Sequence, residues 1–192
     1  MTVHRRLAPL LSQFDFGSES LLERVAGMKD EEYFWEPVEG CWSVRRHDEG
    51  RGVRILGRGD WGLEYEPIPH DSPEPSPFTT IAWRVAHLAS ATALRADWTV
   101  GSKSLLYDDF EMPSSATAGI AALEDATAAW REALTTATTD TDLDQIGRSE
   151  FPVGLDPDMP FIEIAWWVNK ELIHHGAEIA LLRDLWAAKS RA

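Results

Sequence analysis

The sequence predicts an all-α protein, a four-helix bundle with a small β-hairpin inserted between its first and second helices. Four long segments repeat apolar residues at the three- and four-residue steps of an amphipathic helix. Segments rich in proline and glycine separate them, as expected of loops. The 192 residues, 44% hydrophobic and 26% charged, suit one globular domain that spans residues 1–192.

The first helix is expected over residues 7–28, where Gly17 is a weak point. The aromatic segment that follows, from Tyr33 to Trp42, also contains Pro37 and Gly40. This mixture indicates a loop that packs against the bundle rather than a solvated linker.

A small β-hairpin is expected next. Residues 53–56 and 61–65 alternate apolar with polar or glycine positions, and a glycine-rich turn lies between them. Residues 67–77 contain five prolines, which exclude regular structure there. The hairpin and the proline-rich stretch form an insert at about 44–77.

The second helix is expected to begin at Thr79 or Thr80, either of which is a suitable N-cap, and to end near Trp98. The third helix is expected over the alanine-rich segment 115–138, where larger apolar residues follow a helical period.

Polar residues with glycine and proline at 140–158 predict a loop. Pro160 suits the first turn of the fourth helix, which is expected to continue to about Ala188. The four helices together predict a bundle.

The charge and composition exclude several classes of partner. The 32 acidic and 18 basic residues give a formal charge of −14, so nucleic acid and anionic membranes are not expected partners. We expect neither a membrane-spanning helix nor a secretory signal, because no long apolar run occurs and the first residues lack an apolar core. The single cysteine, Cys41, excludes an internal disulfide. We expect a cytoplasmic protein.

Glu171 and His175 carry the sharpest chemical signal. They are four residues apart in the fourth helix and therefore share one face, which is otherwise apolar. His87 lies on a mostly apolar face of the second helix. Buried polar groups need partners, so the three residues are interpreted as a His₂Glu metal centre inside the bundle.

Such a donor set favours Zn²⁺, with Ni²⁺, Fe²⁺ or Mn²⁺ as alternatives. Three protein ligands leave a coordination position open, which is the pattern of a catalytic site. A metal-free arrangement is the competing interpretation, in which Glu171 bonds to His175 and His87 bonds to a backbone carbonyl.

Glu178 is expected either to hold a metal ligand in place or to act as a general base. A simple helix ion pair is an equal alternative. His174 points about 100° away from His175 around the helix and is not expected to be a ligand.

Three segments resemble a known family. Residues 169–185 look like the last helix of the DinB/YfiT-like superfamily of metalloenzymes. Trp83-Arg-Val-Ala-His-Leu88 resembles its second helix, and Glu36-Pro-Val-Glu-Gly-Cys-Trp-Ser43 resembles a turn of the family. Most members carry three histidines, but one of these positions is Glu171 in this chain.

The histidine–glutamate–histidine version resembles the branch that contains mycothiol-dependent maleylpyruvate isomerase, a zinc enzyme. This resemblance implies that His87, Glu171 and His175 are the metal ligands. It also implies that Arg183 matches a recurring arginine, for which a catalytic role is expected. An up-down-down-up bundle and a homodimer are further implications. The insert departs from the family pattern, and it can cover the metal site and change what enters.

Two classes of function remain open. The first is a metal-dependent S-transferase or isomerase, in which the metal holds a low-molecular-weight thiol cosubstrate as a thiolate that attacks an electrophilic small molecule. Arg84, Arg95 and Arg183 are candidates for binding carboxylates of the thiol or the substrate. The second is a non-catalytic metal- or ligand-binding stress protein. A metal-dependent hydrolase with Glu178 as the base uses the same residues.

Overall fold

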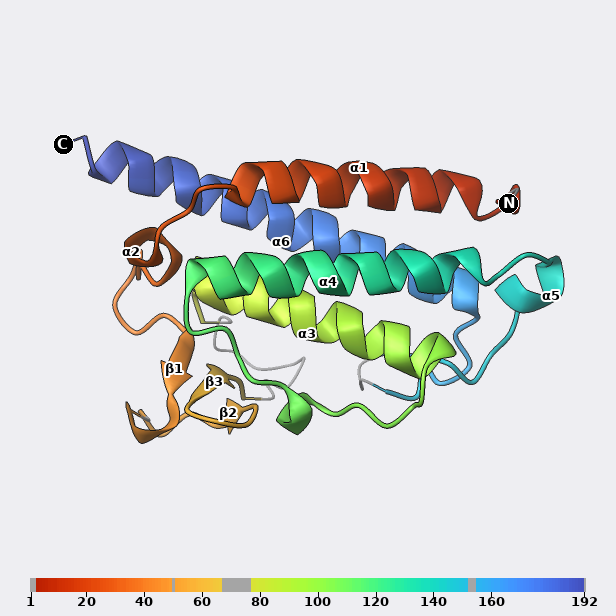
Figure 1. Ribbon diagram of the computed structural model, residues 1–192, viewed down its shortest axis with the longest axis horizontal. Helices are drawn as coiled ribbons and strands as arrows, with labels where there is room; N and C mark the ends of the chain where they lie inside the picture. The colour runs from red at the N-terminus through yellow and green to blue at the C-terminus, as the bar shows by residue number, and fades with distance from the viewer. Residues whose placement is uncertain (1–2, 50, 67–76, 152–154, 192) are drawn as a thin grey trace.

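The computed structural model describes residues 3–49, 51–66, 77–151 and 155–191, and it is mostly helical. Four long helices lie alongside one another: α1 (Ala8–Val25), α3 (Ile81–Val100), α4 (Ala116–Thr135) and α6 (Phe161–Lys189) (Figure 1). The chain runs along α1 and α6 in one direction and along α3 and α4 in the other. The four predicted long helices are therefore present.

Two short helices were not predicted. They are α2 (Asp30–Tyr33), which ends at the first residue of the aromatic segment, and α5 (Asp140–Leu143), at the start of the stretch predicted as a loop. The loop prediction was wrong for α5, because Thr139 and Asp142 form a capping box that starts a helix there. Single turns of 3₁₀ helix occur at His47–Glu49 and Tyr107–Asp109.

The insert contains a three-stranded antiparallel sheet in the order β1-β3-β2, with β1 at Val44–Arg46, β2 at Ile55–Leu56 and β3 at Trp61–Glu64. The predicted hairpin is confirmed as the pairing of β2 with β3. The sequence did not predict β1, since a strand of three residues is too short to show alternation.

The sheet lies beside the end of the bundle where α3 begins (Figure 1). The backbone of Trp42, just before β1, pairs with Phe78 and Thr80, just before α3, through hydrogen bonds of 2.8 and 2.9 Å. Hydroxyls of Ser43 and Thr80 are 2.9 Å apart. The insert is therefore joined to the start of α3, about two helical turns before His87.

Capping residues define the helix starts. Thr80 is the N-cap of α3, as predicted, because its Oγ1 accepts a hydrogen bond of 3.2 Å from the backbone N–H of Trp83. Pro160 was expected inside the first turn of α6, but its backbone is extended and it is the N-cap. Residues 67–76 of the proline-rich stretch lie outside the described residues.

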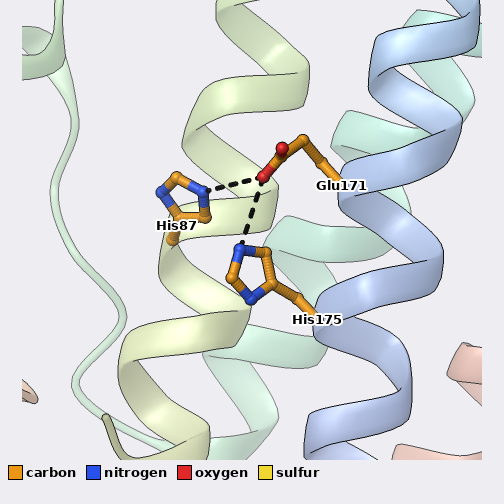
Figure 2. A group of neighbouring side chains, drawn as sticks. All are labelled: His87, Glu171 and His175. Atoms are coloured by element: carbon orange, nitrogen blue, oxygen red, sulfur yellow. Dashed lines mark ion pairs between the residues drawn. The ribbon is translucent and has the colours of Figure 1, made fainter. Parts of the chain in front are cut away.

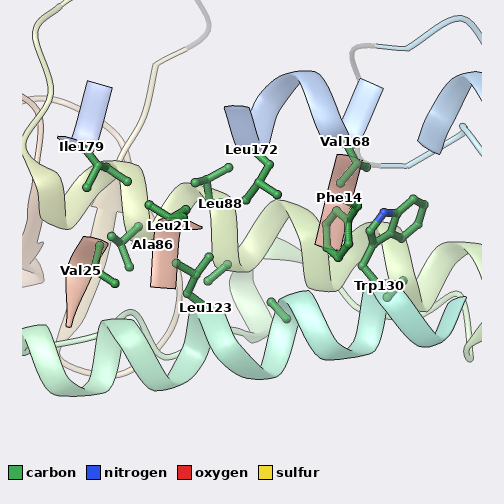
Figure 3. Close-up of a cluster of buried hydrophobic side chains, with 14 of the residues drawn as sticks. Phe14, Leu21, Val25, Ala86, Leu88, Leu123, Trp130, Val168, Leu172 and Ile179 are labelled. Carbon is green, nitrogen blue, oxygen red and sulfur yellow. The ribbon is translucent and has the colours of Figure 1, made fainter. Parts of the chain in front are cut away.

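All four long helices contribute to the buried core (Figure 3). Trp130 of α4 is fully buried and its ring lies 6.1 Å from that of Phe161 of α6. On α6, Ile164, Val168 and Leu182 are buried, whereas Leu185 is 46% exposed. Among the described helices, none is long and apolar enough to cross a lipid bilayer.

Candidate metal centre

Three side chains converge where α3 faces α6 (Figure 2). His87 comes from α3, and Glu171 and His175 come from successive turns of α6. Oε2 of Glu171 lies 3.8 Å from Nε2 of His87 and 3.4 Å from Nε2 of His175. Ligand atoms of the three residues all lie within 4.8 Å of one another. The structure thus brings together the residues that the sequence analysis proposed as ligands.

The core sets the direction of these side chains. Leu88 and Leu172 are almost fully buried and fix how α3 and α6 face the core. His87 and Glu171 each precede one of these leucines, so they point about 100° away around their helices, toward the seam between α3 and α6. The side chains of His87, Glu171 and His175 retain 19, 16 and 12% of their exposure. They are therefore shielded but not sealed from solvent.

Glu171 is ionised in this environment. Its burial acts to raise the pKa of the carboxyl group, but the neighbouring His175, His87 and Lys170 outweigh the burial and hold this pKa well below its usual range. Nζ of Lys170 lies 2.7 Å from Oε1, the oxygen that the histidines do not share. Oε2 is therefore the oxygen directed at the histidines.

His175 is neutral at physiological pH. Its burial lowers the pKa of the imidazole, and the nearby His87 and Arg84 act in the same direction, although Glu171 opposes them. A neutral imidazole is the form that binds a metal ion.

The second ring nitrogen of His175, Nδ1, is in contact with a carboxylate and a guanidinium. Its Nδ1 lies 2.8 Å from Oε2 of Glu178, and that carboxylate also pairs with the guanidinium of Arg84. Arg84 is itself 3.4 Å from Nδ1 of His175. Glu178 therefore lies on the opposite side of the ring from Nε2, in the arrangement by which carboxylates orient metal-binding histidines.

His174 belongs to a second group of ligand-type side chains, with His175 and Glu178. The His174 side chain is 62% exposed and lies 3.5 Å from Oε1 of Glu178. Since Arg84 already neutralises the charge of Glu178, this second group attracts a metal cation less strongly than His87, Glu171 and His175 do. His174 lies outside the group of His87, Glu171 and His175, and the expectation that it is not a metal ligand stays a prediction.

Arg183 joins helices and does not contact His87, Glu171 or His175 in the hydrogen bonds and ion pairs of the described residues. Its guanidinium donates to both carboxylate oxygens of Glu32, at 2.7 and 3.2 Å, and to the backbone carbonyl of Arg24. These contacts join α6 to the end of α1 and to α2. The expected catalytic role of Arg183 stays a prediction.

Arg95 is fully buried on α3, two turns after His87. It donates to the carbonyl of Phe151 at 3.1 Å and lies over the ring of Trp167, 5.1 Å from the centroid. Burial lowers the pKa of Arg95 to about 10.

Two residues near the centre were not assigned a role from the sequence. Lys170 is next to Glu171 in the chain, a spacing that carries no helical signal, yet it bends back to the Glu171 carboxylate. Trp83 lies four residues before His87 in the chain, and its ring stacks on the His87 imidazole. The spacing of four residues between Trp83 and His87 was the feature of the sequence that could have predicted this contact.

The donor set fits a divalent metal ion. Two imidazole nitrogens and one carboxylate oxygen form the ligand set of several catalytic zinc sites, and bonds of about 2.0–2.2 Å in a tetrahedron place ligand atoms about 3.3–3.6 Å apart. The separations of 3.4 and 3.8 Å are close to that spacing. Three protein ligands would leave a coordination position for a small molecule.

A comparison with models of known protein families matches the DinB superfamily over residues 13–179. The matched range includes His87, Glu171, His175 and Glu178, and it ends before Arg183. No curated protein and no solved structure is similar enough to match.

Proposed function

This chain belongs to the DinB superfamily, and from that premise we propose that it is a metal-dependent enzyme, a low-molecular-weight-thiol-dependent S-transferase or isomerase, with zinc as the metal. The convergence of His87, Glu171 and His175 is the observation that carries the proposal. Helix directions also support an up-down-down-up order of the bundle.

The protonation states of the three residues support a metal-binding role. Glu171 carries the negative charge and His175 the neutral ring that a divalent cation requires. Lys170 occupies Oε1 of Glu171, so one carboxylate oxygen is left for the cation. When bound, zinc lowers the pKa of a coordinated thiol, so that the thiol is held as a thiolate at neutral pH.

The proposed chemistry is nucleophilic attack by the sulfur of the thiol cosubstrate on an electrophilic carbon. In an S-transferase the new C–S bond replaces a leaving group, which departs with its electron pair. In an isomerase the thiolate sulfur adds to one carbon of a carbon–carbon double bond, and the π electron pair moves onto a carbonyl conjugated with it. Rotation about the resulting single bond follows, and the electron pair returns to re-form the double bond and expel the thiolate. The histidine–glutamate–histidine pattern supports this class by resemblance.

The geometry gives less support to hydrolysis with Glu178 as the general base. The Glu178 carboxylate contacts Nδ1 of His175 and the Arg84 guanidinium, on the side of the ring that faces away from Nε2. A general base would need to lie within about 3 Å of the water molecule that it deprotonates, on the Nε2 side of the His175 ring. We infer that Glu178 and Arg84 are positioning residues for His175.

Thiol-dependent turnover tests the proposal. The zinc-loaded protein would be mixed with a chromogenic electrophile and, in separate reactions, with a cysteinyl pseudodisaccharide thiol, glutathione, free cysteine or no thiol. We expect turnover with at least one thiol, and loss of that turnover by about 10–100-fold or more in His87→Ala, since loss of a group that holds a metal typically costs about that much.

His174→Ala is the matched control, because His174 neighbours the centre without belonging to the three-residue group. This variant should retain turnover. Activity that does not need a thiol would contradict the transferase and isomerase proposal and favour hydrolysis. Stoichiometric metal without turnover in any thiol would favour a non-catalytic metal-binding protein.

A further inference from the structure

The insert is joined to the candidate metal centre through Glu64 of β3. The Glu64 side chain is fully buried, and its carboxylate accepts hydrogen bonds from the backbone N–H of Ser43 at 2.8 Å, from Arg45 at 2.9 Å and from Arg51 at 3.1 Å. These bonds to a buried carboxylate are charge-assisted and hold the strand in place. The carbonyl of the same residue accepts a hydrogen bond of 2.7 Å from Nε1 of Trp83.

Trp83 in turn contacts the two histidines. Its ring stacks on His87, with centroids 4.9 Å apart and planes 13° from parallel. Its ring also meets His175 edge-on, at a centroid distance of 6.2 Å and an angle of 67°. Trp83 is 9% exposed, so its position is set by the surrounding protein. The line of contacts runs from the β3 backbone through the indole to the imidazole of His87.

The two histidines are held in different ways. Nδ1 of His175 bonds to Glu178, whereas Nδ1 of His87 has no hydrogen-bond partner in the part of the chain that the structure describes. The terminal torsion of a histidine is broad, so a ring without such a bond needs another contact to fix its plane. The stacked face of Trp83 supplies that contact for His87.

We propose that Trp83, held by the Glu64 carbonyl of the insert, is a positioning residue that orients His87 for metal binding. This inference rests on the proposed metal centre. An electron-rich indole face also favours an imidazole that gains positive charge when it binds a cation. The insert thereby sets the affinity and the geometry of the centre through one indole.

Cobalt(II) binding to the full chain tests this role, because its visible absorption bands report coordination geometry independently of any activity. We expect Trp83→Leu to weaken Co²⁺ affinity by about 10–100-fold and to change the visible spectrum, as loss of a contact that orients a metal-binding histidine does. Trp83→Phe retains a stacking ring but loses the bond to Glu64, so we expect the unaltered spectrum with an affinity about 3–10-fold weaker.

Trp35→Leu is the matched control, since Trp35 packs against Trp186 and is not in contact with the three residues of the centre. It should bind Co²⁺ like the unaltered protein. A folded Trp83→Leu protein with unchanged affinity and spectrum would overturn the inference and leave the proposed function standing. If Trp83→Leu does not fold, an affinity of Trp83→Phe within twofold of the original overturns it. Absence of Co²⁺ binding by the unaltered protein would contradict both proposals.

Discussion

The ionisation of His175 is the residue-scale property that the structure determines most directly. Burial lowers the pKa of the His175 imidazole below its ordinary value of about 6.5. As the pH falls through 6.5, the unfolded chain binds a proton at this residue and the folded protein does not. Proton uptake by the unfolded state lowers the free energy of unfolding, so acid destabilises the folded protein.

We therefore expect the free energy of unfolding of the metal-free protein to fall between pH 7 and pH 5.5. In His175→Gln this fall should be shallower by up to about 1.4 kcal/mol per pH unit, the value for one proton. Urea denaturation at several pH values, with chelator present, measures both slopes. Equal slopes for the two proteins would show that His175 titrates normally in the folded state.

The sequence identified His87, Glu171 and His175 because polar residues on apolar helical faces are unusual. It could not pair Arg84 with Glu178, or Glu32 with Arg183, because these ion pairs join residues 94 and 151 positions apart through helix packing. The contact of Lys170 with Glu171 was not predicted for a different reason, since the side chains of adjacent residues on a helix normally point in different directions.

At the scale of elements, α2 packs against α4 at a glycine. A Cβ atom on Gly119 would clash with the hydroxyl oxygen of Tyr33, whose side chain is fully buried. Gly176 of α6 is different, because its nearest neighbours would be 3.9 Å away, in ordinary contact.

Gly119→Ala should therefore lower the free energy of unfolding by about 1–3 kcal/mol through overpacking. Gly176→Ala, the matched control, should leave it unchanged or raise it by up to about 1 kcal/mol, because alanine favours a helix more than glycine does. Chemical denaturation of the metal-free proteins compares the two. Similar stability of both variants would mean that Tyr33 can move away from Gly119.

The Arg183–Glu32 pair ties α6 to α2, and both side chains are largely buried, at 18 and 9% exposure. Arg183→Met leaves Glu32 without its cation, which should lower the free energy of unfolding by about 2–4 kcal/mol. Glu32→Leu combined with Arg183→Met should recover much of that loss, because no buried charge remains.

Urea denaturation and metal content of the single and double variants check this structural role, and metal content should not change. A stable Arg183→Met protein that keeps its metal and loses turnover would instead support the catalytic role that resemblance implied for this residue.

Long elements could be predicted from the sequence, and very short ones could not. The four long helices carry enough turns for their apolar period to be recognised, whereas α2, α5 and β1 span only three or four residues. The capping box of α5 was present in the sequence, but it lies in a polar stretch without an apolar run. Pairing of β1 with β3 depends on the fold of the insert, which local periodicity does not contain.

On the scale of the whole molecule, α1 and α6 leave an apolar groove of about 540 Å³ on the outside of the bundle. Phe16 beside it is 74% exposed and Ile173 is 46% exposed. Among the described residues that line the groove there is no aspartate or glutamate, although the chain carries a net charge of −14. The expected homodimer stays a prediction. Because this face exposes apolar side chains to solvent, the oligomeric state is worth measuring by analytical ultracentrifugation.

At the same scale, the bundle brings α3 and α6 together so that His87 lies close to Glu171 and His175. Metal content per chain, measured by elemental mass spectrometry on untagged protein, tests that central claim most directly. We predict close to one divalent metal ion per chain in the unaltered protein and in His174→Ala, and almost none in His175→Ala. Stoichiometric metal in His175→Ala, or none in the unaltered protein after incubation with zinc, would contradict the account.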